Sequence, residues 1–138
     1  MIALIPAVVL AVAAAFHVYW AIGGQVGLGV SVPQRCDGQP LFRPSAALTL
    51  AVGLALAGAL VLVLAIGGYL RLGLPSVLIR GAVALVCVVF LARALSWSTY
   101  VGLFKKIRDT PFARYDTWLY SPLCLAVGTC LICLLAQR

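Results

Sequence analysis

The sequence predicts an all-α integral membrane protein, built as an antiparallel up-and-down bundle of four transmembrane helices. Of its 138 residues, 64% are hydrophobic and only 9% are charged, whereas soluble domains carry about 25% charged residues. The mean hydropathy is +1.15, and four apolar stretches each have the roughly 20 residues that a helix needs to cross a bilayer. These stretches fill the chain, so we expect one domain over residues 1–138.

The four spans are expected at residues 2–22, 45–69, 76–99 and 117–137. Glycine pairs at 23–24 and 67–68 predict the ends of the first two helices, because glycine adopts the left-handed conformation of a C-cap. The Pro-Ser pair at 44–45 predicts the start of the second helix, and Pro75 predicts the start of the third. A cleaved signal peptide is disfavoured, since no basic segment precedes the first span and its apolar run continues past the small residues at 13–15.

The fourth span contains a proline in its first turns. A full-length span has to begin near Asp116, which places Pro122 inside the helix, where it removes a backbone hydrogen bond and leaves the carbonyl of Trp118 free. The alternative is a shorter helix that begins at Ser121, with the preceding five residues lying in the membrane interface. The sequence leaves both interpretations open.

The basic residues predict the topology. The net charge of +7 comes from ten Lys and Arg against three Asp. The first and third connections share one side of the membrane and carry six basic residues, against three on the other side: Arg35, Arg43, Lys105, Lys106, Arg108 and Arg114 against Arg71, Arg80 and Arg138. We therefore expect both long connections in the cytoplasm, with their cations at the lipid headgroups. Membrane lipid is the expected partner; nucleic acid is not, because no aromatic and basic platform lies outside the apolar spans.

The first connection contains an apolar, glycine-spaced segment, residues 26–33, that is too short to span the membrane. An extended flap over the mouth of the bundle is one interpretation, because irregular backbone at membrane depth requires protein or water to satisfy it. A loop resting on the headgroups is the other.

Arg93 marks a candidate functional site. Only twelve uncharged residues, Gly81 to Ala92, precede it, so the third span has to include the guanidinium. Such a charge costs a few kcal/mol on insertion scales, and it normally faces a bundle interior, a partner or a wet cavity.

Three helices each carry a row of polar and aromatic residues at helical spacing, and the rows are expected at one end of the bundle. They are His17, Trp20 and Gly24; Arg93, Trp97 and Tyr100; and Asp116, Tyr120 and Cys124. We expect Asp116 to pair with Arg93, since it begins the fourth helix at the depth where Arg93 nears the end of the third. This end could form a pocket for a small lipophilic or anionic molecule.

In that pocket His17 and Asp116 are the catalytic candidates, because proton transfer such as an isomerisation is the reaction that this set could support. The ligand-binding candidates are Trp20, Arg93, Trp97, Tyr100 and Tyr120. Two alternatives stay open. Trp and Tyr also anchor helices at interfaces, so the cluster could be purely structural, and an ion or proton path is the third interpretation.

The motifs at these positions resemble those of a family of small bacterial four-helix membrane proteins, catalogued as a domain of unknown function. They are His17-Val-Tyr-Trp20-Ala-Ile-Gly-Gly24, Arg93, Thr110-Pro-Phe-Ala113-Arg-Tyr-Asp116 and Tyr120-Ser-Pro-Leu-Cys124. The resemblance covers essentially the whole chain and implies a bacterial inner-membrane protein with this fold. It implies no activity.

Five cysteines offer a rival site. Cys130 and Cys133 form a C-x-x-C that is similar to the pair in four-helix membrane thiol oxidoreductases such as vitamin K epoxide reductase. Here, however, the pair lies near Arg138, at the end opposite the long connections, and Cys36 is alone in the first connection. Thiol chemistry is therefore disfavoured. No cofactor or metal is predicted, because one His with scattered Cys matches no metal-binding spacing.

Two non-enzymatic functions remain. A structural or accessory subunit, in a homo-oligomer or with a partner subunit, could pack through the small residues Gly53, Ala57 and Gly67. A small transporter or channel is less favoured, because the second helix has almost nothing polar between Thr49 and Tyr69.

Overall fold

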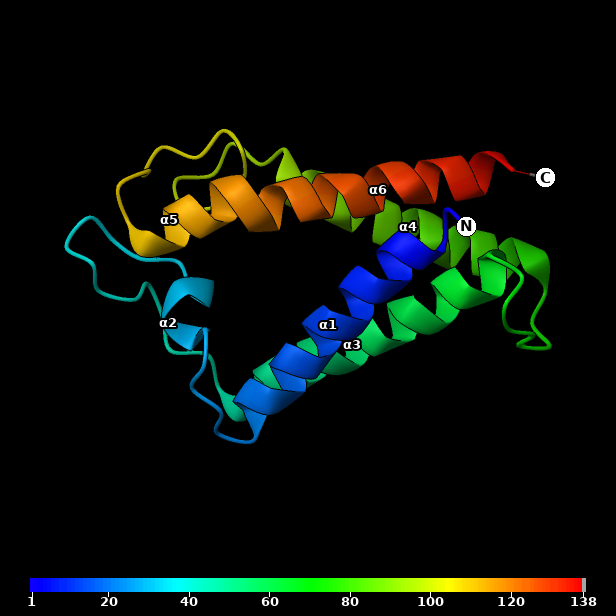
Figure 1. The fold of residues 1–138 in the computed structure, drawn as a ribbon, viewed down its shortest axis with the longest axis horizontal. Helices are drawn as coiled ribbons and strands as arrows, with labels where there is room; N and C mark the ends of the chain where they lie inside the picture. Colours follow the sequence, from blue (N-terminus) through cyan, green and yellow to red (C-terminus); the bar gives the residue numbers. More distant parts are fainter. Residues whose placement is uncertain (138) are drawn as a thin grey trace.

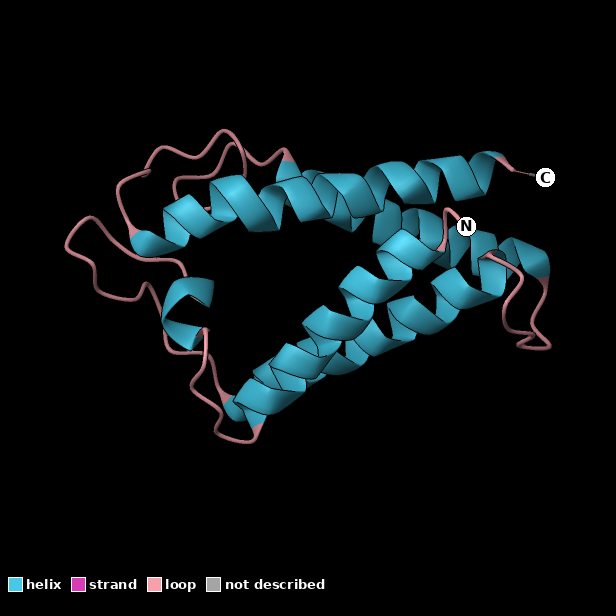
Figure 2. Cartoon of the chain, in the orientation of Figure 1, coloured by secondary structure: helices cyan, strands magenta, loops and turns pink. Residues whose placement is uncertain are grey.

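The chain folds into helices joined by loops, as a computed structural model of residues 1–137 shows (Figure 2). The helices are α1 (Leu4–Ala21), α2 (Leu28–Ser31), α3 (Ala46–Ile66), α4 (Ser76–Ala94), α5 (Pro111–Tyr115), the π-helix η1 (Asp116–Tyr120) and α6 (Ser121–Ala136). The last three form one continuous run, Pro111–Ala136, and this run, α1, α3 and α4 are each long and apolar enough to cross a membrane. The prediction of an all-α membrane protein is therefore confirmed.

Most predicted helix ends are confirmed, and their physical causes are visible. Gly23 and Gly68 follow α1 and α3 with φ of +100° and +80°, the left-handed conformation that favours glycine at a helix end. The Ser45 side chain caps α3 by accepting a hydrogen bond from the Leu48 N–H at 3.2 Å. Local sequence thus determines where these helices begin and end.

The predicted end of the third helix is wrong. α4 stops at Ala94, so Trp97 lies in a loop, not on a helical stripe with Arg93. Serine side chains compete for the backbone here: the Ser98 hydroxyl donates to the Val101 carbonyl at 2.8 Å and accepts from the Val101 N–H at 2.9 Å.

The predicted start of the fourth helix is also wrong. It begins at Pro111, because the Thr110 side chain accepts from the Ala113 N–H at 3.1 Å and Pro111 occupies the first helical position. The interpretation of a short helix starting at Ser121 fails for the same reason, since the run is already helical before that residue.

The long helices form two pairs rather than a uniform bundle. α1 packs mainly against α3, and α4 packs mainly against α6. Figure 1 shows the two pairs meeting at the end that holds both termini and diverging toward the end that holds the first and third connections. The small residues Gly53 and Gly67 lie against α1, beside His17 and Ala3 respectively, so they pack within the chain.

The apolar core lies at the end with the termini. Its buried members come from all four long helices: Ala3, Ala7, Leu10, Ala59, Val63, Val83, Cys87, Val127, Leu131 and Leu134. Arg80 of α4 closes this end by donating hydrogen bonds to the carbonyls of Leu135 and, at 3.3 Å, Gln137. These carbonyls lack partners within α6, and a cation there complements the helix dipole. Arg138, which was counted in the topology, lies outside the described residues.

Candidate functional site

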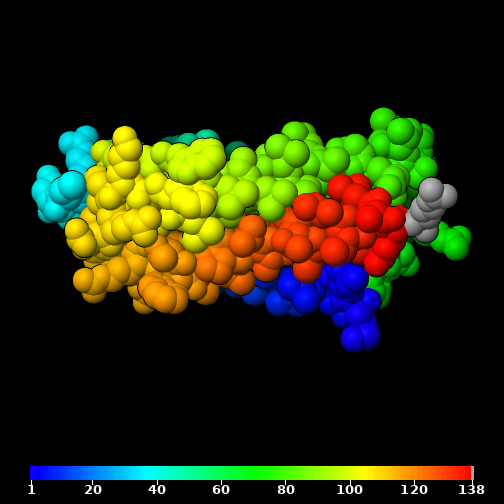
Figure 3. Space-filling model, turned by 90° about the horizontal axis from the view of Figure 1, so that it is seen from above, coloured from blue at the N-terminus to red at the C-terminus, as the bar shows by residue number. Residues whose placement is uncertain are grey.

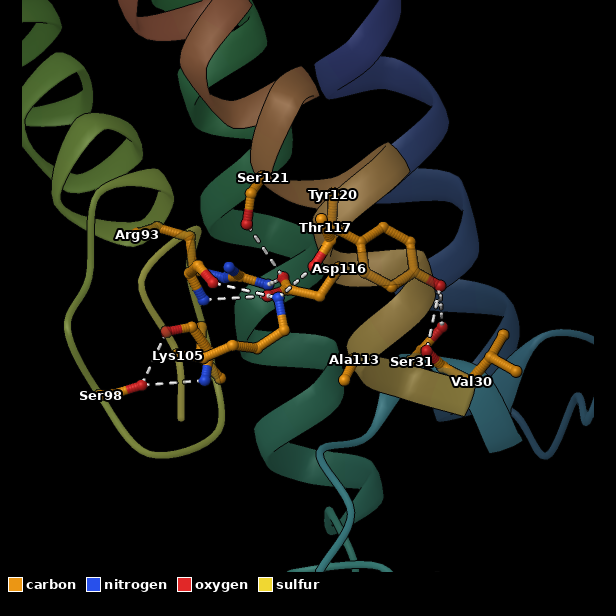
Figure 4. Close-up of polar contacts among 12 residues, drawn as sticks. Val30, Ser31, Arg93, Ser98, Lys105, Ala113, Asp116, Thr117, Tyr120 and Ser121 are labelled. Atoms are coloured by element: carbon orange, nitrogen blue, oxygen red, sulfur yellow. Dashed lines mark hydrogen bonds and ion pairs between the residues drawn. The ribbon is translucent and has the colours of Figure 1, made fainter. Parts of the chain in front are cut away.

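Asp116 is the centre of a buried polar cluster at the divergent end. Its side chain is fully buried, accepts three hydrogen bonds and forms an ion pair with Lys105 (Figure 4). Oδ1 accepts from Arg93 at 2.7 Å and from the Ser121 hydroxyl at 3.2 Å. Oδ2 lies 3.0 Å from Lys105 Nζ and accepts from the Gly102 N–H at 2.9 Å. The pairing of Arg93 with Asp116 that the sequence predicts is confirmed.

The π-helix η1 carries Asp116 at its first position. The Ser121 N–H donates to the Asp116 carbonyl, five residues back instead of four. Pro122 comes next; it has no N–H for the Trp118 carbonyl, and its ring would crowd that carbonyl in a regular α-helix. One wide π-helical turn avoids this crowding and does not need the missing N–H. Turns of this kind are often found at functional sites. The helix therefore continues through Pro122, loosened just before it.

The loop after α4 folds inward and places Lys105 beside Asp116. The Leu103 N–H donates to the Ala94 carbonyl at 2.8 Å, and Gly102 has φ +96° with its Cα so close to Ser96 that a Cβ would lie 2.5 Å from the Ser96 carbonyl oxygen. Lys105 is 1% exposed. Besides Asp116, its ammonium reaches the Thr117 hydroxyl at 2.6 Å and the Gly102 carbonyl at 3.1 Å. The expectation that Lys105 is a headgroup-facing loop cation is wrong.

The cluster has an excess of positive charge. Two cations, Arg93 and Lys105, face one carboxylate, and within residues 1–137 both recorded ion pairs involve that Asp116. Arg93 Nη1 is buried and has no hydrogen-bond partner among the described residues, although the side chain as a whole is 31% exposed. A buried donor without an acceptor costs about 1–3 kcal/mol, and more when the group is charged. Arg93 thus carries one donor nitrogen for which the described residues supply no acceptor.

The first connection closes over this end and contacts the fourth helix. Its apolar segment forms the single turn α2 instead of an extended strand, and α2 packs against α5. The Tyr120 hydroxyl donates to the Val30 carbonyl at 3.2 Å and lies 3.3 Å from the Ser31 hydroxyl. The Gln34 side chain accepts from the Phe112 N–H at 3.2 Å. We call this segment, residues 26–34, the flap.

The model of a family described as "Protein of unknown function (DUF3995)" matches residues 10–131, a range that includes α3 and α4, most of α1 and of the last helical run, the flap and the Asp116 cluster. The chain belongs to the DUF3995 family. Neither the search of curated proteins nor the search of solved structures gives a match. The resemblance to a family of unknown function is confirmed.

The DUF3995 chain does not bring its first predicted row into the cluster. His17 Nδ1 lies 2.7 Å from the Ala13 carbonyl oxygen and donates a hydrogen bond to it. The Trp20 indole donates to the Val26 carbonyl at 2.8 Å, which holds the base of the flap. Both residues lie in the last turns of α1, which diverge from η1 in Figure 1. A proton-transfer role for His17 stays a prediction.

The second and third rows are only partly brought together. The Trp97 ring is 77% exposed and lies 5.5 Å from the Phe104 ring, and Tyr100 is half-buried in the same loop. Tyr120 points toward the flap, whereas Asp116 points toward Arg93 (Figure 4). The π-helix separates them, because it breaks the four-residue spacing that predicted a common face. The ligand-binding roles of these aromatic residues stay predictions.

Two surface hollows lie outside the Asp116 cluster. One is lined by Ala15, Phe16, Tyr19 and Val26, and the other by Arg114, Tyr115, Trp118 and Leu119. Neither lining includes Arg93, so a pocket beside Arg93 stays a prediction.

The cysteines form no disulfide within residues 1–137. Cys36 and Cys133 are exposed, and Cys130 is half-buried on the same helix as Cys133.

Sequence reasoning missed four members of the cluster: Gly102, Lys105, Thr117 and Ser121. A lysine beside a second lysine in a connection is typical of an exposed charge. One feature of the sequence could have indicated Lys105: the chain has ten basic but only three acidic residues. A buried Asp in such a chain is expected to pair with more than one nearby cation.

Proposed function

We propose that this DUF3995 protein binds a small amphipathic molecule through an anionic group at the divergent end of its helix pairs. Arg93 is the primary contact and Lys105 supports it, while Asp116 holds both cations in place. The supporting observation is Arg93 Nη1, a buried guanidinium nitrogen without a partner among the described residues, in a cluster that has one more cation than anion. A carboxylate or phosphate would satisfy both deficits at once.

Binding is better supported than catalysis. Asp116 accepts three hydrogen bonds, one of them from Arg93, and pairs with Lys105, so its role here is to position Arg93 and Lys105 rather than to remove a proton. Within residues 1–137 no hydrogen bond joins His17 to the cluster, since its Nδ1 donates to the Ala13 carbonyl. Proton transfer would therefore require a ligand long enough to extend from η1 to the last turns of α1.

The first experiment compares the molecules that co-purify with wild type, Arg93→Gln and Arg80→Gln. Arg80 is the matched control, because it is also an arginine in a membrane span, but it bonds only to carbonyls at the opposite end. Arg93→Gln leaves Asp116 two of its three hydrogen bonds and the ion pair with Lys105, so the fold should persist. We expect an anionic amphipath in wild type and Arg80→Gln and its loss from Arg93→Gln, measured by native mass spectrometry and lipid extraction.

A matched probe pair tests the chemistry directly. Dodecanoate should raise the thermal unfolding midpoint of the wild type in detergent, whereas dodecanol of the same chain length should not, because a ligand that binds only the folded state stabilises it. Equal shifts from both probes, or a dodecanoate shift that persists in Arg93→Gln, would contradict the assignment.

A structural role is the second candidate function, and the satisfied geometry of Asp116 favours it. Three hydrogen-bond donors and the Lys105 ammonium, from α4, the following loop and α6, meet at one carboxylate, so the cluster could serve only to fix helix packing and partner contacts. An empty wild type, with Arg93→Gln merely less stable, would support this function instead.

We also propose that the protein lies in the bacterial cell membrane with both long connections in the cytoplasm, as positive-inside counting supports. Cys36 is exposed in the first connection and reports on its side directly. A membrane-impermeant maleimide should label it only after the cells are permeabilised, with Cys36→Ala as the control. Labelling of Cys36 in intact spheroplasts, absent from Cys36→Ala, would instead place the long connections outside the cytoplasm.

A further inference from the structure

The outer face of α5 and η1 carries an open hollow that the Asp116 cluster does not use. Arg114, Tyr115, Trp118 and Leu119 line about 280 Å³ at the surface. Figure 3 shows the run from α5 to α6, yellow-orange to red, as a continuous strip on the surface of the molecule. Trp118 is 83% exposed, Tyr115 48% and Leu119 44%. Asp116, in the same run, is fully buried, so the hollow and the cluster are on different faces.

The polarity of this face changes along the helix. Arg114 is in the first turn of the run that begins at Pro111, so it lies at the membrane boundary. Trp118 and Leu119 follow about one turn deeper, and Leu123, 37% exposed, continues the face toward the membrane centre. Charged, then aromatic, then aliphatic is the order in which a phospholipid presents its phosphate, its glycerol esters and its acyl chains.

The walls of the hollow are almost entirely apolar, and two polar groups of its lining residues, the Arg114 guanidinium and the Trp118 indole N–H, lack protein partners within residues 1–137. The Arg114 guanidinium makes no ion pair within residues 1–137, and in the same part of the chain the Trp118 indole N–H has no recorded acceptor. An arginine fork matches phosphate geometry with two parallel hydrogen bonds. An indole with an apolar body and one donor suits the ester region of a bilayer.

We propose that this hollow is a binding site for one anionic glycerophospholipid of the surrounding leaflet. Arg114 binds the phosphate, the Trp118 indole N–H donates to an ester carbonyl, and one acyl chain follows Leu119 and Leu123. An anionic headgroup is selected over a zwitterionic one because the site supplies a cation and no acidic side chain. This site does not depend on the ligand proposed for Arg93.

The test uses full-length protein in nanodiscs made from equal parts of phosphatidylglycerol and phosphatidylcholine with identical acyl chains. Native mass spectrometry after gentle release measures the ratio of the two lipids that remain bound to wild type, Arg114→Gln and Arg71→Gln. Arg71 is the control, because it is an exposed arginine in the connection at the other end. Because Arg114→Gln removes a direct hydrogen bond to the phosphate, worth about fivefold in binding, the ratio of phosphatidylglycerol to phosphatidylcholine should fall about fivefold in this variant, and much less in Arg71→Gln, which removes only a general surface charge.

A second measurement places the lipid beside the indole. Phosphatidylglycerol brominated on its acyl chains should quench tryptophan fluorescence more strongly than brominated phosphatidylcholine, and the difference should disappear in Trp118→Phe. A wild type without phosphatidylglycerol preference overturns the proposal. So does an equal loss in Arg114→Gln and Arg71→Gln, which would show attraction by net charge alone, and so does selective quenching that survives in Trp118→Phe.

Discussion

Replacing Asp116 by Asn should be the most destabilising polar substitution in this protein. The change keeps the shape of the side chain but leaves Lys105, whose side chain is 0% exposed, and Arg93, 31% exposed, facing each other without an anion. Removing one partner of a buried ion pair costs about 3–5 kcal/mol, because the remaining charge is uncompensated. Arg93 can turn partly toward solvent or headgroups, so we expect about 3 kcal/mol, mostly from Lys105.

The free energy of unfolding, measured by denaturant titration in mixed micelles, checks this value. Lys105→Met alone should cost less, about 1–2 kcal/mol, since Asp116 keeps three donors, including Arg93. The double variant Asp116→Asn with Lys105→Met should regain about half of the loss, because the buried unpaired ammonium is gone. The reasoning fails if Asp116→Asn is no less stable than Lys105→Met, or if the double variant is less stable than Asp116→Asn.

Three further substitutions test the elements around the cluster. Gly102→Ala should cost about 1–3 kcal/mol in the same titration, because its φ is +96° and its Cβ would lie 2.5 Å from the Ser96 carbonyl oxygen. Tyr120→Phe removes the hydroxyl contacts with the flap; hydrogen exchange in residues 28–34 should accelerate about fivefold, equivalent to about 1 kcal/mol, with global stability almost unchanged. Arg80→Met should cost about 1–2 kcal/mol and speed exchange only in the last turn of α6, since it removes the cap on that helix.

The sequence predicts those features of this fold that depend on short-range chemistry. Gly23, Gly68 and Ser45 end or begin helices through their own conformation or side chains, so their positions follow from local sequence. The Arg93–Asp116 pair was also predictable, because an intramembrane guanidinium needs an anion and the two residues lie at matching depths on helices that follow one another. The chain has only three acidic residues, so few other side chains could pair with Arg93.

The features that the sequence did not predict depend on tertiary structure. Pro122 indicated a loosened helix, but a proline alone does not specify whether the helix kinks, frays or forms the π-helical turn that is found here. Lys105 is buried because the loop after α4 turns inward at Gly102, and loop paths of this kind leave no periodic pattern. The divergence of the helix pairs was equally hidden, since all four spans are almost uniformly apolar and so do not specify which faces meet.

The two ends of the molecule are stabilised by different interactions, and this difference favours function at the divergent end. Apolar side chains from all four long helices join only near the termini, whereas the other end is held by the Asp116 cluster and by hydrogen bonds to the flap. Buried ion pairs recover little more than their own desolvation cost, so local opening should require less free energy at the divergent end. The π-helix η1 carries Asp116 at its start and Tyr120 at its end. One five-residue element therefore contacts the cations through Asp116 and the flap through Tyr120, so a substitution that loosens η1 should weaken both sets of contacts.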